Sequence, residues 1–284
     1  MNQVQFDIEL LTCAYQSARP VLMLRNVKIP RRKLVFVIGL SGVGKSTFIE
    51  ALGLMNNVFD RSADNRVYFF DEQNTQTEIG ALWQGNNQLI SNFRNHYFSF
   101  IFQNTNLMHN FTAGENMCIS QMISGKSIKV AKQTVLDVMN KLNLPPEVFD
   151  KKVSALSGGQ RQRLAFVRAI TARFEVLFGD EPTGNLDKDT GYRMMEVLKK
   201  HLHEKEKTGI IVSHDLELAL YFGDEIIMLT PATSTEGVVY GTIETSKCMT
   251  KNGTEWLNGD GITLHNPLKY IHQTLNISIP LDYA

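Results

Sequence analysis

The sequence predicts an α/β fold built on a mostly parallel β-sheet. First, short apolar runs alternate with segments of helical spacing, which is typical of strand–helix–strand units. Second, a glycine-rich stretch at Gly39 to Thr47 joins an apolar run to a helix-like segment. Third, polar side chains follow several of the apolar runs, and parallel sheets bind ligands at the carboxyl ends of their strands. Together these observations predict a ligand site at one edge of the sheet.

The composition fits one large domain or two smaller domains of an ordinary globular protein of 284 residues. Basic and acidic side chains balance at 29 each, so no overall positive charge favours nucleic acid as a partner. The cysteines Cys13, Cys118 and Cys248 lie far apart, which argues against a zinc site or a disulfide framework and fits a reducing cytoplasm. The chain start lacks the features of a signal peptide, and no run has the length of a membrane span. We therefore expect a cytoplasmic protein that reaches a membrane only through a partner.

The elements are expected in the following order. Residues 4–38 alternate apolar runs, among them 21–24 and 27–30, with polar breaks, which predicts an antiparallel β-region leading into a buried strand at 34–38. Phe48, Ala51, Leu52 and Met55 have the spacing of one helix face. Residues 71–95 are polar and are predicted as mostly loop with one short helix. The other strands are expected at 66–70, 97–102, 175–179, 210–212, 226–229 and 238–240, and the other helices at 128–142, after 157 and around 195–202.

The stretch Gly39-Leu40-Ser41-Gly42-Val43-Gly44-Lys45-Ser46-Thr47 has the pattern of a phosphate-binding loop between a strand and a helix. Glycines allow successive backbone N–H groups to point at phosphate oxygens, and the helix start adds positive potential. Lys45 can reach the β- and γ-phosphates, and the Ser46 hydroxyl can take a magnesium position. The alternative is a glycine-rich turn that arose by chance.

Two further stretches supply what such a loop needs. Asp180 ends an apolar strand and can hold magnesium, and Glu181 can polarise the attacking water; the alternative is a plain Asp-Glu-Pro turn. Ser157-Gly158-Gly159 precedes a helix and forms a second anion-binding helix start, unless it is an ordinary N-cap. A head-to-tail pair of chains could place the loop of one and the Ser-Gly-Gly of the other on the same nucleotide.

These motifs resemble those of an ATP-binding-cassette (ABC) ATPase over roughly residues 10–243. In order, they match the Walker A loop, the Q-loop at Phe102-Gln103, the signature LSGGQRQR, Walker B, the D-loop Gly184-Asn185-Leu186-Asp187 and the switch histidine His214. The segment Gly-Asp-Glu-Pro-Thr-Gly-Asn-Leu-Asp is similar to the subgroup of lipoprotein-release, macrolide-export and cell-division ATPases. The resemblance implies an ABC-type P-loop NTPase domain at 1–244, with an antiparallel β-subdomain and an inserted helical subdomain near 103–165. Residues 245–284 would be an extension of unknown role.

The resemblance also implies roles for individual residues. Gln103 would contact magnesium and water, Asp187 would organise the dimer seam, and His214 would hold the γ-phosphate, although a lone histidine at a strand end is usually structural. Tyr15 would stack on adenine, a contact worth roughly 1–3 kcal/mol by analogy with nucleobase stacking, or it simply packs. The expected catalytic residues are Glu181, His214 and Gln103, and the expected magnesium ligands are Ser46, Gln103 and Asp180. The expected nucleotide-binding residues are Tyr15, Gly39, Ser41, Gly42, Val43, Gly44, Lys45, Ser46, Thr47, Ser157, Gly158, Gly159, Gln160 and Asp187.

The resulting hypothesis is an ATPase subunit on the cytoplasmic face of the membrane. It would form a homodimer around two Mg-ATP and move transmembrane, permease-like partner subunits, without nucleic acid. One alternative is a cassette ATPase that acts on nucleic acid, ribosomes or a cytosolic effector without a membrane partner; another is a module in which ATP binding alone is the signal. Where the family usually has Gly-Glu before the Walker A strand, this chain has Arg32-Lys33, and an insertion at 230–236 follows Leu229.

Overall fold

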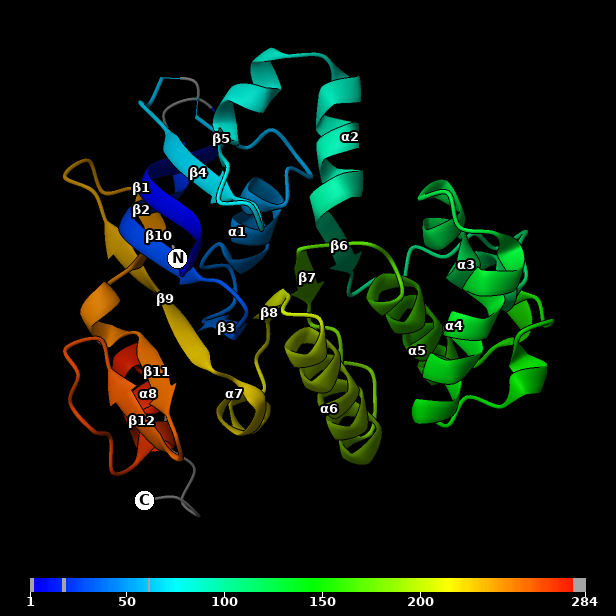
Figure 1. The fold of residues 1–284 in the computed structure, drawn as a ribbon. Coiled ribbons are helices and arrows are strands. Elements are labelled where there is room, and N and C mark those ends of the chain that lie inside the picture. Colours follow the sequence, from blue (N-terminus) through cyan, green and yellow to red (C-terminus); the bar gives the residue numbers. More distant parts are fainter. Residues whose placement is uncertain (1–2, 17–18, 61, 278–284) are drawn as a thin grey trace. The chain divides into compact units, whose positions relative to one another are not determined.

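The computed structural model describes residues 3–16, 19–60 and 62–277. The chain divides into two compact units (Figure 1). Unit 1 comprises residues 1–91 and 212–284, and unit 2 comprises residues 92–211.

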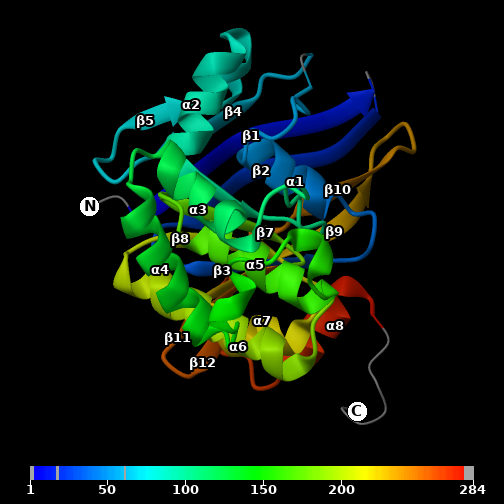
Figure 2. The same ribbon diagram turned by 90° about the vertical axis from the view of Figure 1, so that its right-hand side faces the viewer.

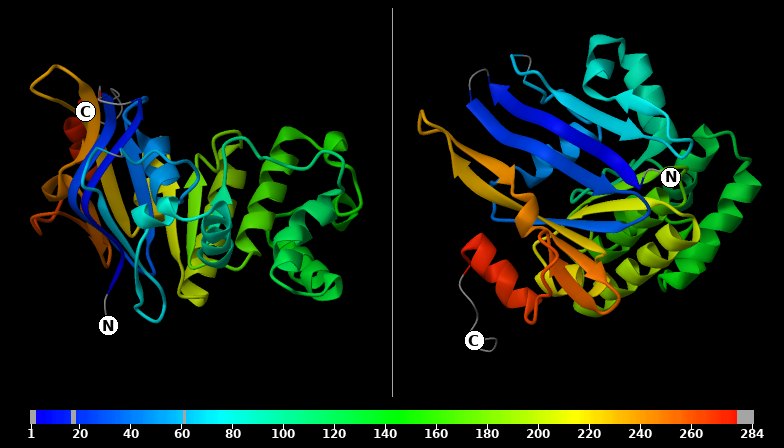
Figure 3. Two further views of the ribbon diagram at one scale, coloured as in Figure 1. Left: turned by 90° about the horizontal axis from the view of Figure 1, so that it is seen from above. Right: turned by 60° about the vertical axis from the view of Figure 1, so that its left-hand side comes forward.

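Unit 1 is built on a curled, mixed sheet (Figure 3, right). Its strands lie in the order β5-β4-β1-β2-β10-β9-β3. β1 pairs antiparallel with β2 and with β4, whereas β3 runs parallel to β9. The strand bounds are β1 (Val4–Gln16), β2 (Arg19–Pro30), β3 (Leu34–Gly39), β4 (Arg66–Phe70), β5 (Gln76–Glu78), β9 (Glu225–Thr233) and β10 (Val239–Ile243).

The core of unit 1 follows from the apolar runs of these strands. All five residues from Leu34 to Ile38 are at most 1 % exposed, as expected of a strand covered on both faces. The aromatic pair Phe6 and Phe69 joins β1 to β4 with ring centroids 5.3 Å apart. Among the helices of this unit are α1 (Lys45–Leu52), α7 (Leu216–Phe222) and the 3₁₀ helix η1 (Gly80–Gln84).

The end of the described chain forms what we call the C-terminal module, residues 245–277. It contains η4 (Thr245–Lys247), β11 (Met249–Asn252), β12 (Glu255–Asn258) and α8 (Pro267–Leu275). β11 and β12 form an antiparallel hairpin, and β11 adds to the sheet edge at β9. α8 lies against α7 and β9 (Figures 1 and 3).

Unit 2 combines three strands with a group of helices. The strands lie in the order β8-β7-β6, and β6 runs parallel to β7. Figure 2 shows α3, α4 and α5 side by side, with α3 packed against both of the others. The bounds are β6 (Phe98–Ile101), α3 (Ala113–Ile123), α4 (Ile128–Lys141), η2 (Pro146–Val148), η3 (Val153–Ala155), α5 (Gly158–Ile170), β7 (Val176–Asp180), α6 (Lys188–Glu204) and β8 (Thr208–Val212).

The structure confirms the α/β class and corrects several element boundaries. The runs at 21–24 and 27–30 belong to the single strand β2, whose pairing with β1 keeps the same register on both sides of Asn26 although that residue has a φ of 52°. The segment 71–95 is not mostly loop: it contains β5, η1 and the start of α2 (Asn87–Tyr97), which spans the unit boundary. Met55 lies beyond α1, which ends at Leu52 with Gly53 as its C-cap. The expected insertion at 230–236 begins as an extension of β9 to Thr233.

Within residues 3–16, 19–60 and 62–277, no helix combines the length and the apolar character that crossing a bilayer requires.

Candidate functional site

The phosphate-binding loop lies in unit 1 between β3 and α1. Gly42 and Gly44 have φ angles of 78° and 101°, a left-handed backbone that glycine adopts without the steric cost of a Cβ. Gly44 is the N-cap of α1, and no side chain caps this helix start. The first N–H groups of α1 therefore remain available to an anion, as a phosphate site requires.

Lys45 folds back over the loop. Its Nζ donates to the carbonyls of Gly39 and Leu40, both at 2.9 Å. These bonds hold the ammonium group against the backbone of its own loop. Gly39, Ser41, Gly42, Val43, Ser46 and Thr47 complete the stretch, in which Val43 and Thr47 are buried. Their role in nucleotide binding stays a prediction.

Tyr15 stands at the end of β1 beside α1. Its phenol hydroxyl donates to Glu50 Oε2 at 2.7 Å and lies 3.1 Å from Thr47 Oγ1. Burial of the hydroxyl, together with the Glu50 bond, raises the pKa of Tyr15 to about 12. The residue remains 58 % exposed, so a face is left for a planar ligand. The adenine-stacking role stays a prediction.

His214 belongs to the same unit and follows β8. The Ser213 N–H donates to the Val37 carbonyl of β3 at 3.3 Å, two residues before the phosphate loop begins. Asp215 is the N-cap of α7 and accepts from the Leu218 N–H at 2.9 Å. His214 is thus an exposed side chain held between a fixed strand end and a capped helix, at the same sheet edge as the loop.

In unit 2, β6 and β7 bring the remaining polar residues together. The register Ile101↔Gly179 places Gln103 and Asp180 just beyond the ends of neighbouring parallel strands. Glu181 has a φ of 46°, which is uncommon for a non-glycine residue. Such strain occurs preferentially at functional positions, and it turns the chain sharply after Asp180.

The Ser-Gly-Gly stretch also takes the predicted position, at the start of α5. Ser157 Oγ accepts from the Gln160 N–H, and Gln160 Oε1 accepts from the Ser157 N–H, which forms a capping box. A Cβ at Gly158 would meet no atom within 4 Å, so the helix start is open on that side. Ser157 retains its hydroxyl hydrogen as a donor. Asp187 caps α6 in the same way, and its bond from the Thr190 N–H at 2.9 Å lowers the pKa of its carboxyl.

Two side chains of α5, the half-buried Arg168 and the buried Gln162, were missed by the sequence reasoning. Arg168 donates to the carbonyls of Thr105 and Asn106, each at 2.9 Å, and thereby fixes the segment that follows Gln103. Burial lowers the pKa of this guanidinium. Gln162 donates to the Pro182 carbonyl at 2.9 Å, directly after Glu181. The signature helix is therefore bonded to the segments that carry Gln103 and Glu181. In the sequence, the one hint of these bonds is that two polar residues, Gln162 and Arg168, lie among the apolar residues of the helix.

The donor set fits a magnesium ion that is shared with phosphate. Within the described residues, no group of three His, Cys, Asp or Glu side chains could hold a metal on its own. Mg²⁺ commonly binds through one or two protein oxygens together with substrate phosphates and water. A hydroxyl such as Ser46 and a carboxylate such as Asp180 suit that chemistry.

With this geometry in place, the comparison with known proteins is decisive. A family model described as "ABC transporter" matches residues 23–184, more than half of the chain. The chain belongs to the ABC transporter family. Its ABC relatives include the lipoprotein-releasing system ATP-binding protein LolD of Pseudoalteromonas translucida, 32 % identical over 77 % of this chain and 90 % of LolD. The uncharacterized ATP-binding protein YclH of Bacillus subtilis is 30 % identical over 71 % of this chain and 83 % of YclH.

The macrolide export ATP-binding/permease protein MacB of Vibrio parahaemolyticus is 34 % identical over 80 % of this chain, which spans about a third (33 %) of MacB. Among solved structures, the MJ0796 cassette, a dimer bound to ADP and Pi, is 27 % identical with a TM-score of 0.65, over 78 % of this chain and 93 % of that one. The predicted family, its lipoprotein-release and macrolide-export subgroup, and the ATPase activity are thereby confirmed.

Proposed function

We propose that this ABC ATPase dimerises around two Mg-ATP and drives a conformational change in a transmembrane partner on the cytoplasmic face of the membrane. The observation that carries the proposal is the open start of α5, where Ser157 keeps a donor and nothing lies over Gly158. An uncovered anion-binding helix start suits a nucleotide brought by a second copy of the chain. The dimeric assembly of the MJ0796 cassette supports the same arrangement.

In this proposal the residues of each unit have separate tasks. Lys45 and the loop N–H groups bind the β- and γ-phosphates, while Ser46, Gln103 and Asp180 hold magnesium. Glu181 orients and deprotonates the attacking water, and His214 binds the γ-phosphate. Ser157 and Gly159 of the partner copy close the site, and Asp187 lies at the dimer seam. Magnesium neutralises charge that develops on the phosphate oxygens.

We propose a groove of unit 2 as the docking site for the membrane partner. It has a volume of about 360 Å³ and lies between β6 and α3. Phe100 and Phe102 form its aromatic wall, stacked with centroids 5.7 Å apart, and Ile123 at its rim is 64 % exposed. Arg168 and Arg173 also line it. An apolar helix that carries an acidic side chain would complement this lining, and Arg168 connects the groove to the segment after Gln103.

The groove is tested by affinity purification from detergent-solubilised cells in Mg-ATP. We expect the chain to recover a stoichiometric multi-span protein and Ile123→Glu to lose it, because a buried unpaired charge opposes docking. Ile128→Glu is the matched control, since Ile128 is 53 % exposed on α4 and does not line the groove. Nucleotide binding of both variants reports on folding. A known membrane complex extracted in the same experiment serves as the control for solubilisation. If that complex is recovered but the chain brings down only soluble proteins or nucleic acid, the alternative of a cassette ATPase without a membrane partner is supported.

A further inference from the structure

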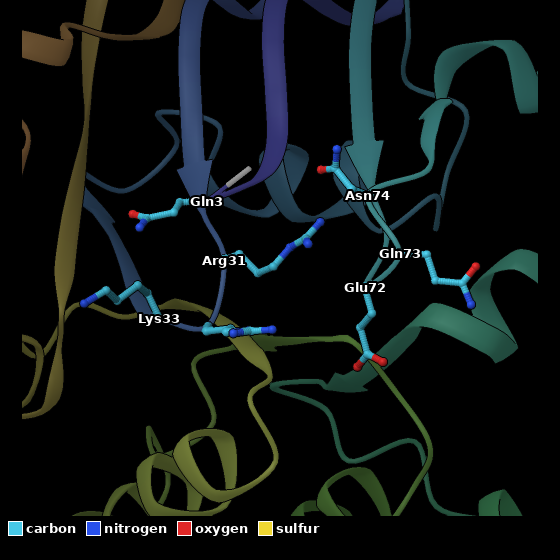
Figure 4. A pocket seen from close by; sticks show the side chains of 7 residues that line it. Gln3, Arg31, Lys33, Glu72, Gln73 and Asn74 are labelled. Carbon is cyan, nitrogen blue, oxygen red and sulfur yellow. The ribbon is translucent and has the colours of Figure 1, made fainter. Parts of the chain in front are cut away.

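A second site is suggested by a cavity of unit 1 that has no part in the proposed ATPase chemistry (Figure 4). Its volume is about 710 Å³, and it lies between the β2–β3 turn and the β4–β5 turn. The phosphate loop follows β3, whereas this cavity adjoins the residues that precede it, so the two are roughly 20 Å apart along a six-residue strand. The lining residues are Gln3, Arg31, Arg32, Lys33, Glu72, Gln73 and Asn74.

The side chains that line the cavity carry net positive charge. They include three consecutive cations, Arg31, Arg32 and Lys33, and a single carboxylate, Glu72. The neighbouring Asp71 carboxylate accepts the N–H groups of Gln73 and Thr75, at 3.0 and 2.7 Å, and so closes the β4–β5 turn. The cavity therefore has an excess of cations although the whole chain has no net charge.

The basic wall is anchored to the sheet. Arg31 Nη2 donates to the Phe70 carbonyl at 2.7 Å, and its own N–H donates to the Gln3 carbonyl at 2.7 Å. The far end of the turn is fixed by the Leu34 N–H, which donates to Asp224 Oδ2 at 2.8 Å. Figure 4 shows Arg31 extended toward the loop of Glu72 and Asn74, while Lys33 projects to the side. The guanidinium is thus held in place before any ligand binds.

The backbone of the same turn is strained. Arg32 has a φ of 60°, in the left-handed region that favours glycine. A side chain there is disfavoured by the steric clash of its Cβ, and the exposed Arg32 side chain recovers none of this cost by burial in a core. Backbone strain of this kind occurs preferentially at binding sites.

We propose that this cavity binds a small phosphorylated molecule with at least two phosphate charges and several hydroxyl groups. Arginine forks match phosphate oxygens in pairs, and Lys33 adds a point charge. The amides of Gln3 and Asn74 and the Glu72 carboxylate suit hydroxyl groups of the same ligand. The volume lies within the range of small-molecule sites, and the excess of cations in the lining favours an anionic ligand. The source is either a soluble metabolite or a lipid headgroup.

The first experiment measures binding of fructose 1,6-bisphosphate by titration calorimetry, with Mg-ADP saturating the phosphate loop. We expect the parent protein to bind this bisphosphate. The double variant Arg32→Glu with Lys33→Glu should bind it with an affinity about tenfold lower or more, which is the equivalent of one lost charge-assisted contact. The double variant Lys151→Glu with Lys152→Glu changes the net charge equally at another exposed basic pair and should leave the affinity unchanged. Flotation with phosphatidylcholine vesicles containing phosphatidylinositol 4-phosphate, whose headgroup carries two phosphates and several hydroxyl groups, tests the headgroup source. Binding to neither probe, or equal loss in both double variants, would overturn the proposal.

A second variant separates function from folding. Arg32→Gly removes the strain, so the thermal midpoint should not fall, while the affinity for the bisphosphate should fall. Glu206, at a φ of 53°, supplies the control: Glu206→Gly should likewise not lower the midpoint and should leave binding unchanged. Unchanged binding in Arg32→Gly would contradict the site.

Discussion

The phosphate loop and the C-terminal module are both parts of unit 1, but they are specified by the sequence in different ways. The loop is a short run in which glycines at 42 and 44 adopt positive φ angles and Lys45 is bonded to the backbone of its own loop. Its conformation follows from local residues, so the same residues both specify its shape and perform its chemistry.

The C-terminal module depends instead on contacts with distant parts of the chain. Met249 of β11 pairs with Ile226 of β9, and Trp256 is 5 % exposed. Lys251 Nζ donates to the carbonyls of Leu220 and Tyr221 at the end of α7, both at 3.3 Å, and lies 5.5 Å from the Trp256 ring centre. Many unrelated sequences could satisfy such contacts, which is why the module carries no recognisable motif.

Gly223, the C-cap of α7, lies beside the Trp256 ring. A Cβ at Gly223 would lie 2.5 Å from the Ala219 carbonyl, so this helix end requires glycine, whereas its distance of 3.5 Å from the indole would be an ordinary contact. The module is thus packed against the end of the helix that begins directly after His214.

The largest expected effect is a loss of ATP hydrolysis without a loss of stability, at the phosphate loop. Lys45→Ala should reduce ATP hydrolysis about 10²- to 10³-fold, the usual loss when one donor to a developing negative charge is removed. The thermal midpoint should change little, because the Lys45 ammonium group is bonded to carbonyls of its own loop and not buried in a core. Steady-state ATPase assays and calorimetry check both. A parallel collapse of the midpoint would show that the loop also stabilises the fold.

The second effect concerns stability. Trp256→Ala should lower the free energy of unfolding by about 3 kcal/mol, because it removes a large buried side chain and leaves a cavity. Trp83→Ala is the control, since Trp83 is only half-buried and should cost less. Denaturant unfolding measures both variants. Equal losses of unfolding free energy in the two variants would mean that Trp256 stabilises the protein no more than the half-buried Trp83 does.

The smallest effect is a pH dependence at the junction of β9 and β11. Glu225 pairs with Thr250, and burial raises its carboxyl pKa to about 7, an effect that Lys33 partly opposes. Between its ordinary value of 4.5 and about 7, the native state holds more protons than the unfolded chain. The free energy of unfolding therefore falls as pH rises through that window and levels off above it, by on the order of 2 kcal/mol.

Glu225→Gln should remove this contribution. The variant should be more stable than the parent above about pH 7 and should lack this slope at lower pH. Thermal midpoints measured across the window test the sign. A parent protein that becomes more stable as pH rises, with the variant flat, would contradict the assignment.

The elements that were predictable have local causes. The buried strand before Gly39 and the helix start at Ser157 follow from apolar runs, glycines and a capping residue, and the structure has both. The helix α2 was underestimated because its polar surface leaves only Ile90 fully buried. Arg168 and Gln162 were missed because their partners are backbone carbonyls, which no sequence pattern reveals.

The central claim is that two copies of the chain close around ATP, and size-exclusion chromatography with light scattering tests it most directly. Glu181→Gln binds ATP but should not hydrolyse it, so at saturating Mg-ATP we expect a stable dimer that dissociates when nucleotide is removed. Adding Lys45→Ala to the same variant should prevent dimer formation. A Glu181→Gln protein that elutes as a monomer while nucleotide binding is normal would contradict the account.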